Sequence, residues 1–328
     1  MTASPPLPHR RWAVTGGTGL LGNNLVRTLL ARGAEVKVLV RRPPRREFEG
    51  LGVHVVSGDL DDEAALRALC ADVDCVVHSA AKVEIRYGGR AEFEAVNVEG
   101  TARVLRALPP ETRLVHVSTV DALGMRSRAA PADEDCAPAA HEAGVPYVDT
   151  KRAADRLVLE RAANAVIVHP TYMLGPWDWR PSSGRMILEV ARGAGVLAPP
   201  GGNNFVHVAD VVEGLLAAAG RPHGGRWILG HADLSYREAW TLIAQETGAR
   251  PPRGELPRWA LAGATAALTL AGKLGLAEGD INAASVHMSG HPHYFTAARA
   301  RTELALPQTP IRQAIADAWA WFGENGLR

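Results

Sequence analysis

The segment WAVTGGTGLLG at residues 12–22 joins a short apolar run to closely spaced glycines, and apolar residues at helical spacing follow it up to Gly33. A second apolar run occupies residues 35–40. Glycines let the backbone turn sharply and approach a diphosphate, whose charge the N–H groups and dipole of the next helix stabilise. We therefore predict a β-α-β unit that binds a dinucleotide through Gly16, Thr18, Gly19, Leu20 and Leu21.

The end of the second apolar run distinguishes between cofactors. An acidic side chain there would hydrogen-bond the ribose 2′-hydroxyl of NAD and repel the 2′-phosphate of NADP. This chain has Arg41 and Arg42 instead, and arginine offers forked, permanently charged donors for phosphate oxygens. Arg45 and Arg46 follow, and they fit a solvated loop. We expect NADP(H) to be the preferred cofactor, with NAD(H) as the alternative.

Length and composition limit the classes of protein. A chain of 328 residues is long enough for a large α/β domain with a smaller appendage. A net charge of +1 favours neither nucleic acid nor anionic lipid as a partner. The 3 cysteines lack metal-ligand spacing, which predicts a reducing, cytoplasmic location, no metal site and no disulfide framework. Residues 1–10 contain no signal peptide and are predicted to be a disordered lead-in.

Residues 259–272 form an apolar, Ala- and Leu-rich stretch between Arg258 and Lys273. The stretch is shorter than the roughly 20 residues that a membrane-spanning helix needs, so we predict no transmembrane segment. We expect a packed helix that covers the substrate pocket. Peripheral membrane contact through residues 256–275 is the less favoured alternative.

Short apolar runs and helical patterns alternate through the first half of the chain. This alternation predicts a doubly wound, Rossmann-type α/β fold with a parallel sheet. We expect further buried strands near residues 54–56, 75–78, 114–117 and 166–168, helices at 61–69, 91–108 and 147–163, and a loop at 129–146. The predicted units are a cofactor-binding domain at 11–171, to which 205–230 returns, and a smaller, mostly helical C-terminal substrate-binding region at 172–204 and 231–328.

In such a sheet the ligand lies beyond the carboxyl ends of the strands. Asp59 and Leu60 follow the third predicted strand, where a carboxylate can accept from the adenine amino group. Small residues follow the fourth strand and allow the backbone to lie against the ribose and diphosphate, in the run Ser79, Ala80, Ala81 and Lys82. Hydroxyl groups follow the fifth strand, on Ser118 and Thr119.

Tyr147 and Lys151 are four residues apart and lie on one face of the predicted helix. The ammonium can lower the pKa of the phenol and make it a usable acid or base. Two other polar groups have simpler interpretations. His291 and His293 resemble a ligand pair, but no carboxylate or cysteine neighbour completes a metal site. His207 is expected at a strand end, and Asp210 as the cap of a helix at 211–219.

These motifs together resemble the extended short-chain dehydrogenase/reductase superfamily and its NAD-dependent epimerase/dehydratase family. The resemblance runs from about residue 12 to the C-terminus. It rests on Thr15-Gly16-x-x-Gly19-x-x-Gly22, Asp59-Leu60, Asn97-Val98-Glu99-Gly100-Thr101, Ser118-Thr119 and Tyr147-x-x-x-Lys151. Residues 169–176 and 205–211 are most similar to the branch of dihydroflavonol reductases and hopanoid-associated epimerase-like proteins.

The resemblance implies that Tyr147 donates a proton to a substrate carbonyl oxygen while the nicotinamide C4 delivers hydride to its carbon. Lys151 would bind the nicotinamide ribose and hold down the phenol pKa. Thr119 matches the hydroxyl that hydrogen-bonds the carbonyl, and Ser118 is the alternative. Asn97 matches a supporting asparagine, although capping or packing explains it equally well. The residues expected to line the nicotinamide are Pro170 and Thr171.

The substrate is predicted by two departures from nucleotide-sugar epimerases. Where these typically have Arg-Asp, this chain has Asn203-Asn204, and a neutral amide cannot replace the arginine that grips a diphosphate. Met173, Trp177 and Trp179 can line an apolar pocket, although core packing explains each of them singly. We therefore expect an NADPH-dependent reductase of an apolar ketone or aldehyde. The alternatives are a nucleotide-sugar epimerase or dehydratase with tightly bound NAD(P), and a non-catalytic NADP sensor; homodimers are frequent in the superfamily.

Overall fold

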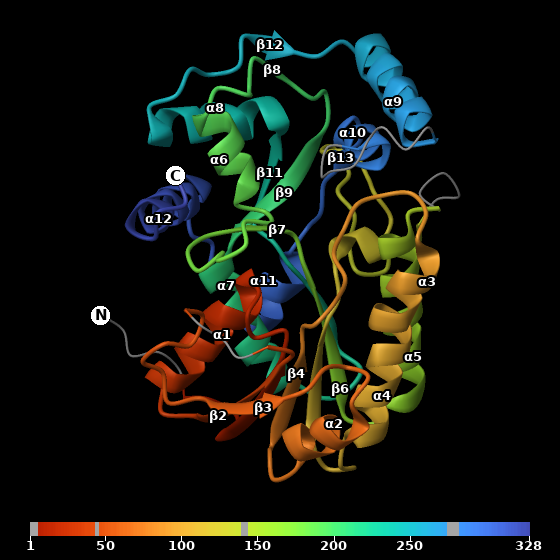
Figure 1. The fold of residues 1–328 in the computed structure, drawn as a ribbon, viewed down its shortest axis with the longest axis vertical. Coiled ribbons are helices and arrows are strands. Elements are labelled where there is room, and N and C mark those ends of the chain that lie inside the picture. Colours follow the sequence, from red (N-terminus) through yellow and green to blue (C-terminus); the bar gives the residue numbers. More distant parts are fainter. Residues whose placement is uncertain (1–5, 43–45, 139–143, 274–281) are drawn as a thin grey trace.

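A seven-stranded parallel sheet is the centre of the computed structural model, which describes residues 6–42, 46–138, 144–273 and 282–328 (Figure 1). Residues 1–5 of the predicted lead-in and 139–143 of the predicted loop lie outside this range. The strand order is β10-β6-β5-β4-β1-β2-β3, which confirms the predicted doubly wound α/β fold. The strands are β1 (Arg11–Thr15), β2 (Glu35–Val40), β3 (His54–Ser57), β4 (Cys75–His78), β5 (Arg113–Val117), β6 (Ala165–Pro170) and β10 (Arg226–Leu229).

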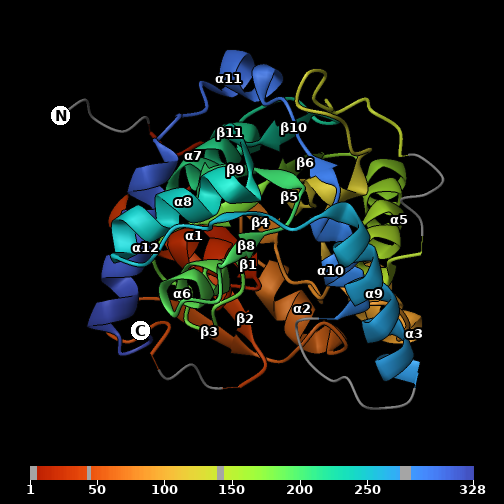
Figure 2. The same ribbon diagram turned by 90° about the horizontal axis from the view of Figure 1, so that it is seen from above.

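Helices cover both faces of this sheet (Figures 1 and 2). Alternate strand residues point to opposite faces, so Val14 and Val38 lie in one apolar core and Ala13 and Leu39 in another. The first core is covered by α1 (Leu20–Ala31), α7 (Val208–Ala219) and α11 (Ala298–Leu304). The second is covered by α2 (Glu63–Cys70), α4 (Gly100–Ala107) and α5 (Pro146–Arg161).

Two predicted elements differ from the structure. The third strand was expected to be buried, which is wrong, because β3 is an edge strand that pairs only with β2 in the sheet, and Val55 is 37% exposed. The single helix expected at 91–108 is divided into α3 (Arg90–Phe93), the π-helical turn η1 (Glu94–Glu99) and α4. A π-turn widens the helix locally, and here it contains the buried Asn97.

A smaller unit lies over the carboxyl edge of the central sheet (Figure 1). Its own sheet has the order β11-β9-β13, with β7 also paired to β9, and its core packs against three helices. The strands are β7 (Tyr172–Leu174), β9 (Gly202–His207), β11 (Ala232–Ser235) and β13 (Pro292–His293). The helices are α6 (Arg185–Ala191), α8 (Tyr236–Thr247) and α12 (Ile311–Glu324), and a separate pair of short strands is β8 (Leu197–Ala198) with β12 (Gly254–Glu255).

Helix α7 begins earlier than its sequence predicts. His207 is the N-cap residue, and its Nδ1 accepts a hydrogen bond of 2.9 Å from the backbone N–H of Ala209. The expectation that Asp210 caps this helix is therefore wrong. Asp210 lies in the first turn, where its carboxylate accepts hydrogen bonds from the backbone N–H and the hydroxyl of Thr309, both at 2.7 Å. This contact ties α7 to the segment that precedes α12.

Helix α9 (Arg258–Lys273) is largely exposed next to α10 (Ala283–Ser289). The expectation of a packed helix is wrong for most of its length, because Leu261 is buried but Trp259 is 78% and Leu270 60% exposed. Alanine and leucine favour helix formation without help from packing. Within the described ranges, no helix combines the length and apolar character needed to cross a bilayer.

Gly22 allows α1 to start directly against the glycine loop. A Cβ atom at Gly22 would lie 2.2 Å from the carbonyl oxygen of Gly16, whereas one at Gly19 would be 3.5 Å from it. We predict that Gly22→Ala lowers the free energy of unfolding by about 1–3 kcal/mol through overpacking, and that the matched Gly19→Ala changes it much less. Thermal unfolding of both variants without ligand measures this. Equal melting temperatures would contradict the packing.

Candidate active site

The glycine loop forms a backbone cradle at the carboxyl edge of the sheet. Gly16 has a φ of +74°, and a Cβ atom there would lie 2.7 Å from the backbone nitrogen of Ala80. Helix α1 follows with no side-chain cap at Gly19 and no acidic residue in its first turn. A helix N-terminus of this kind attracts an anion through its N–H groups and dipole. The cradle therefore fits the diphosphate of a dinucleotide.

A buried histidine joins this loop to the segment after β4. His78 Nδ1 lies 2.8 Å from the hydroxyl of Thr15, and its Nε2 lies 3.0 Å from the hydroxyl of Thr101. The Thr15 hydroxyl also accepts a hydrogen bond of 3.2 Å from the backbone N–H of Ala80. Sequence reasoning assigned His78 only to a strand end. The signal in the sequence was a polar residue at the end of an otherwise apolar strand.

Asn97 fixes the segment after β4 to helix α5. Its Oδ1 accepts from the backbone N–H of Lys82 at 2.8 Å, and its Nδ2 donates to the Lys82 carbonyl at 3.2 Å and to the Thr150 hydroxyl at 3.0 Å. The Lys82 ammonium itself forms an ion pair of 3.2 Å with Glu92. In this structure Asn97 holds a loop and a helix in register.

The predicted adenine and ribose contacts lie at the ends of β2 and β3. Arg41 and Arg42 follow β2 directly, and both are exposed. The Asp59 carboxylate accepts a hydrogen bond of 2.9 Å from the backbone N–H of Asp61. The Leu60 side chain packs so close to α4 that a Cβ at Gly100 would lie 2.8 Å from it. Leu60 therefore helps to set the distance between this loop and α4.

Tyr147 and Thr119 come together from α5 and from the turn after β5. Tyr147 is buried, and burial raises the pKa of its phenol well above the usual range, with the carboxylate of Asp121 adding to the effect. The Thr119 side chain lies beside the phenol and acts on its pKa in the opposite direction. Thr119 Oγ1 also lies 3.3 Å from Oδ2 of Asp121. The phenol of Tyr147 therefore keeps its proton, and the hydroxyl donor of Thr119 lies beside it.

Ser118 and Thr119 point to different partners. The Ser118 hydroxyl donates a hydrogen bond of 2.7 Å to Asp155 on α5, whereas the Thr119 hydroxyl lies beside Tyr147. Successive side chains of an extended segment alternate in direction, which explains the separation. Of the two hydroxyl groups offered by the sequence, the structure brings Thr119 to the phenol.

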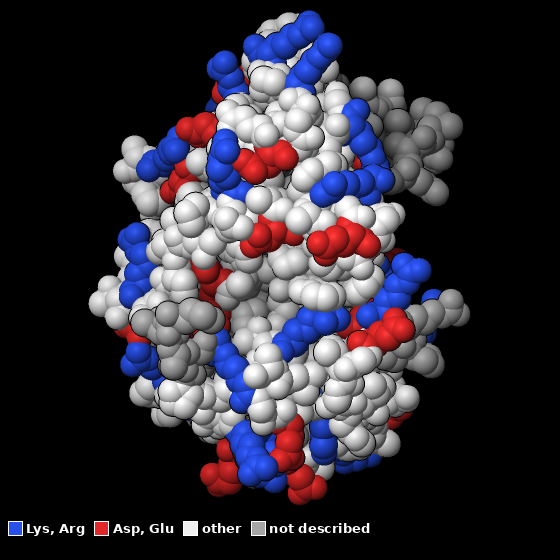
Figure 3. Space-filling model, turned by 90° about the vertical axis from the view of Figure 1, so that its left-hand side faces the viewer, with Lys and Arg blue, Asp and Glu red and all other residues white. Residues whose placement is uncertain are grey.

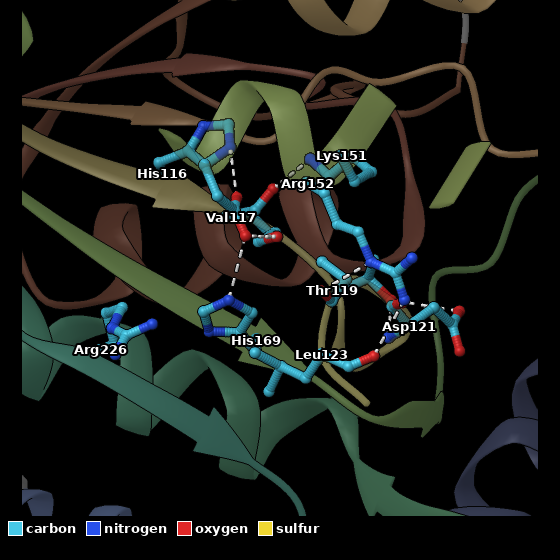
Figure 4. Close-up of polar contacts among 12 residues, drawn as sticks. His116, Val117, Thr119, Asp121, Leu123, Lys151, Arg152, His169 and Arg226 are labelled. Carbon is cyan, nitrogen blue, oxygen red and sulfur yellow. Dashed lines mark hydrogen bonds and ion pairs between the residues drawn. The ribbon is translucent and has the colours of Figure 1, made fainter. Parts of the chain in front are cut away.

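Lys151 lies on the same buried side of α5 as Tyr147. Its Nζ donates a hydrogen bond of 2.7 Å to the carbonyl of Val117, as Figure 4 shows. Burial lowers the pKa of Lys151 to about 8, and the Asp155 carboxylate opposes this shift. The sequence predicted that this ammonium lowers the pKa of Tyr147. In the structure the ammonium is directed at a backbone carbonyl instead, and the net pKa shift of the phenol is upward.

Residues that the sequence did not indicate lie within the electrostatic range of Asp121, as Tyr147 does. The charge of Asp121 influences Tyr147, Tyr236 and His293, so side chains from α5, α8 and β13 lie within its electrostatic range. Burial lowers the pKa of His293, which the sequence considered only as a metal ligand. No cluster of three or more His, Cys, Asp or Glu side chains suited to a metal ion occurs in the described part of the chain.

Asn204 is buried in the small sheet, and both the nitrogen and the oxygen of its side-chain amide form hydrogen bonds. Its Nδ2 donates to Asp233 at 2.8 Å and to the carbonyl of Phe295 at 3.0 Å, and its Oδ1 accepts from the backbone N–H of His231 at 2.9 Å. Asn203 precedes it and accepts a hydrogen bond of 2.9 Å from the Asn204 N–H. The amide of Asn204 therefore has a structural task that links β9, β11 and the segment after β13.

Two of the three predicted substrate residues belong to an aromatic cluster. Trp177 and Trp179 pack against Trp321 of α12, with ring centroids 5.7 Å and 5.0 Å away, and the Arg27 guanidinium stacks 3.4 Å from the Trp177 ring. This arrangement gives both tryptophans a packing role between α1 and α12. Of the other predicted lining residues, Pro170 ends β6, Thr171 follows it directly, and Met173 lies in β7.

The parallel sheet, the glycine cradle and the Thr119, Tyr147 and Lys151 group define a nucleotide-binding enzyme of the short-chain dehydrogenase/reductase class. One face of the molecule is hollowed near its middle, with acidic and basic side chains interspersed around it (Figure 3). The model of the NAD dependent epimerase/dehydratase family matches residues 12–230. The chain therefore belongs to this family, as the sequence motifs predicted.

Relatives are similar over almost the whole chain. Sterol demethylase protein B of Methylococcus capsulatus is 34% identical over 324 residues, which cover 96% of this chain and 98% of that protein. A candidate dihydroflavonol 4-reductase of Synechocystis is 32% identical, with 95% and 94% covered. The crystal structure of a nucleoside-diphosphate-sugar epimerase from Pseudomonas aeruginosa has a TM-score of 0.78 at 25% identity, with 97% and 99% covered.

His116, on β5, predicts a pH dependence of stability. Burial lowers its pKa from 6.5 to about 4. Between these values the unfolded chain binds a proton that the native state does not, so the free energy of unfolding falls as the pH falls through this window. We predict that His116→Gln removes up to about 1.4 kcal/mol per pH unit of this slope. Urea unfolding from pH 4.5 to 7 measures it.

The matched control for this experiment is His223→Gln, because His223 is an exposed histidine. The control should keep the slope of the wild-type protein. An unchanged slope in His116→Gln would show that His116 does not titrate as its burial requires.

Proposed function

We propose that the protein is an NADPH-dependent reductase that transfers hydride to the carbonyl carbon of a largely apolar ketone or aldehyde. The observation that carries this proposal is the meeting of Tyr147 with Thr119, one helical turn from the buried Lys151. The group lies at the same edge of the sheet as the glycine cradle, because parallel strands have their carboxyl ends together.

The roles of the residues follow from their placement. Burial keeps the Tyr147 phenol protonated at neutral pH, which suits the donor of a proton to a substrate oxygen. Thr119 hydrogen-bonds the same oxygen. We assign the Lys151 ammonium, which the Val117 carbonyl holds, to the nicotinamide ribose. A bound nicotinamide supplies the hydride. A phenol whose pKa is raised holds its proton, and reduction of a carbonyl needs a group that donates a proton to the oxygen.

Two features support an apolar carbonyl substrate. Asn203 stands in the place of the diphosphate-binding arginine of nucleotide-sugar epimerases, and its neutral amide accepts a hydrogen bond of 2.9 Å from the backbone N–H of Asn204. The relatives named sterol demethylase protein B and dihydroflavonol 4-reductase carry the names of sterol and flavonoid chemistry. We infer the same broad class of substrate, an apolar polycyclic or aromatic ketone, for this chain.

A nucleotide-sugar epimerase with tightly bound NAD(P) is the second candidate, favoured by the fold of the Pseudomonas aeruginosa structure. It would retain cofactor through purification and show no net consumption of NADPH. A panel of apolar ketones and nucleotide sugars, followed by NADPH absorbance, separates the two candidates. Steady NADPH oxidation with a ketone supports the reductase, and product from a nucleotide sugar without oxidation supports the epimerase.

We predict that Tyr147→Phe lowers the turnover of a ketone by about 10²–10⁴-fold, because the proton donor to the carbonyl oxygen is lost. NADPH affinity should stay close to that of the wild-type protein. Steady-state kinetics and NADPH titration by fluorescence measure the two quantities. Normal turnover would refute the mechanism, and a loss of NADPH binding alone would assign Tyr147 to the cofactor. A non-catalytic sensor predicts no turnover in either protein.

We propose NADP(H) as the preferred cofactor because Arg41 and Arg42 are exposed directly after β2. Replacing both with alanine should weaken NADPH binding by roughly ten- to a hundredfold, as expected for hydrogen bonds to a charged group, and NADH binding much less. Arg46→Ala removes an exposed arginine of the same loop and is the matched control. Equal losses for both cofactors would exclude a 2′-phosphate clamp.

A further inference from the structure

A cavity lies beside helix α5, and Asp155 and His169 are among its lining residues. Its volume is about 280 Å³, and it lies between α5, the ends of β6 and β10, and the loop before residue 139. It contains none of the residues predicted to hold the dinucleotide. Its charged walls come from Arg152 and Arg156 on α5, Arg226 on β10, and Glu134 and Asp135 on the loop.

Asp155 is held in this cavity by groups from two strands. Its Oδ2 accepts from the Ser118 hydroxyl at 2.7 Å and lies 3.2 Å from Nε2 of His169, while Nε2 of His116 lies 3.4 Å from its Oδ1. Figure 4 shows His116 and His169 reaching toward the same point from neighbouring strands. Burial opposes ionisation, yet the contacts with His116 and His169 hold the pKa of Asp155 well below its usual range. The carboxylate is therefore a fixed negative charge.

Lys151 lies one turn before Asp155 on the same helix, so the two side chains share a face of α5. The ammonium bonds the carbonyl of Val117, which lies between His116 and Ser118 in the sequence. Its positive charge reaches His78 and His116, and both histidines are buried. In these surroundings Asp155 is the carboxylate whose charge acts on Lys151.

We propose that Asp155 is a positioning residue that keeps the Lys151 ammonium charged and directed at the Val117 carbonyl. The carboxylate does so from the same face of α5, where Ser118, His116 and His169 fix it in the wall of this cavity. The catalytic importance of this role rests on the proposed reductase function; the charge on Lys151 does not. Asp155 also repels the Tyr147 phenolate, so the carboxylate favours charge on the lysine and a proton on the phenol.

Several other groups face this pair and titrate or carry charge. They come from β4, β5, β6, β10, the loop before residue 139, and α5 itself, and they are His78, His116, His169, Arg226, Glu134, Asp135, Arg152 and Arg156. A test must therefore measure the pH titration of the Lys151 ammonium itself. The chain permits this, because its only lysines are Lys37, Lys82, Lys151 and Lys273.

The experiment is a pH titration of the protein labelled with [¹³Cε]lysine, followed by NMR, with the Lys151 signal assigned by Lys151→Arg. Asp155→Asn should move the Lys151 titration to lower pH by about one unit or more, because loss of a nearby negative charge destabilises the ammonium. Asp155→Glu should return the Lys151 titration most of the way to its wild-type pH. Asp149→Asn is the matched control, since Asp149 lies on α5 but pairs with Arg90 at 3.1 Å. It should leave the Lys151 titration unchanged.

An unchanged titration of Lys151 in folded Asp155→Asn overturns the proposal. Where asparagine impairs folding, Asp155→Ser leaves room for water and must give the same downward shift. With a ketone found in the substrate panel, Asp155→Asn should also move the alkaline limb of the kcat profile to lower pH, and Asp155→Glu should move it back. If no ketone is reduced by the wild-type protein, the proposed function fails while the NMR titration still decides the role of Asp155.

Discussion

Close backbone contact between the glycine loop and the segment after β4 is the constraint on which the site depends. Gly16 lies against Ala80, and Thr15 bonds both the Ala80 N–H and the ring of His78. Through Thr101 and Asn97, the same segment is joined to α4 and to α5. The end of β1 is therefore linked to the helix of Tyr147 by hydrogen bonds between buried groups, which are costly to leave unpaired.

Three buried polar residues join neighbouring elements through their hydrogen bonds. Asp155 joins β5 and β6 to α5, Asn204 joins three segments of the small sheet, and Asp210 joins α7 to the chain before α12. A buried polar group without such a partner would cost several kcal/mol. Of these contacts, that of Asp210 ties a helix on the central sheet to the segment before α12 of the smaller unit.

Much of the fold was predictable because the apolar patterns are local and strong. The glycine loop, the order of strands and helices, and the common face of Tyr147 and Lys151 all follow from spacing in the sequence. The exposure of β3 and the first residue of α7 did not follow from spacing in the sequence. An edge position depends on which strands pair, and the cap of α7 is a histidine whose ring nitrogen takes a role more usual for Ser or Asp.

The sequence by itself determined the fold class and the family, and it indicated Thr119, Tyr147 and Lys151 as candidate site residues, because these depend on periodicity and on short motifs. Only the tertiary structure decided how those residues are charged and directed. It gave Ser118 and Thr119 different partners and directed the Lys151 ammonium at a backbone carbonyl. It also brought the charge of Asp155 within range of that ammonium. These outcomes depend on desolvation and on distances between β5, β6 and α5, which no spacing along the chain encodes.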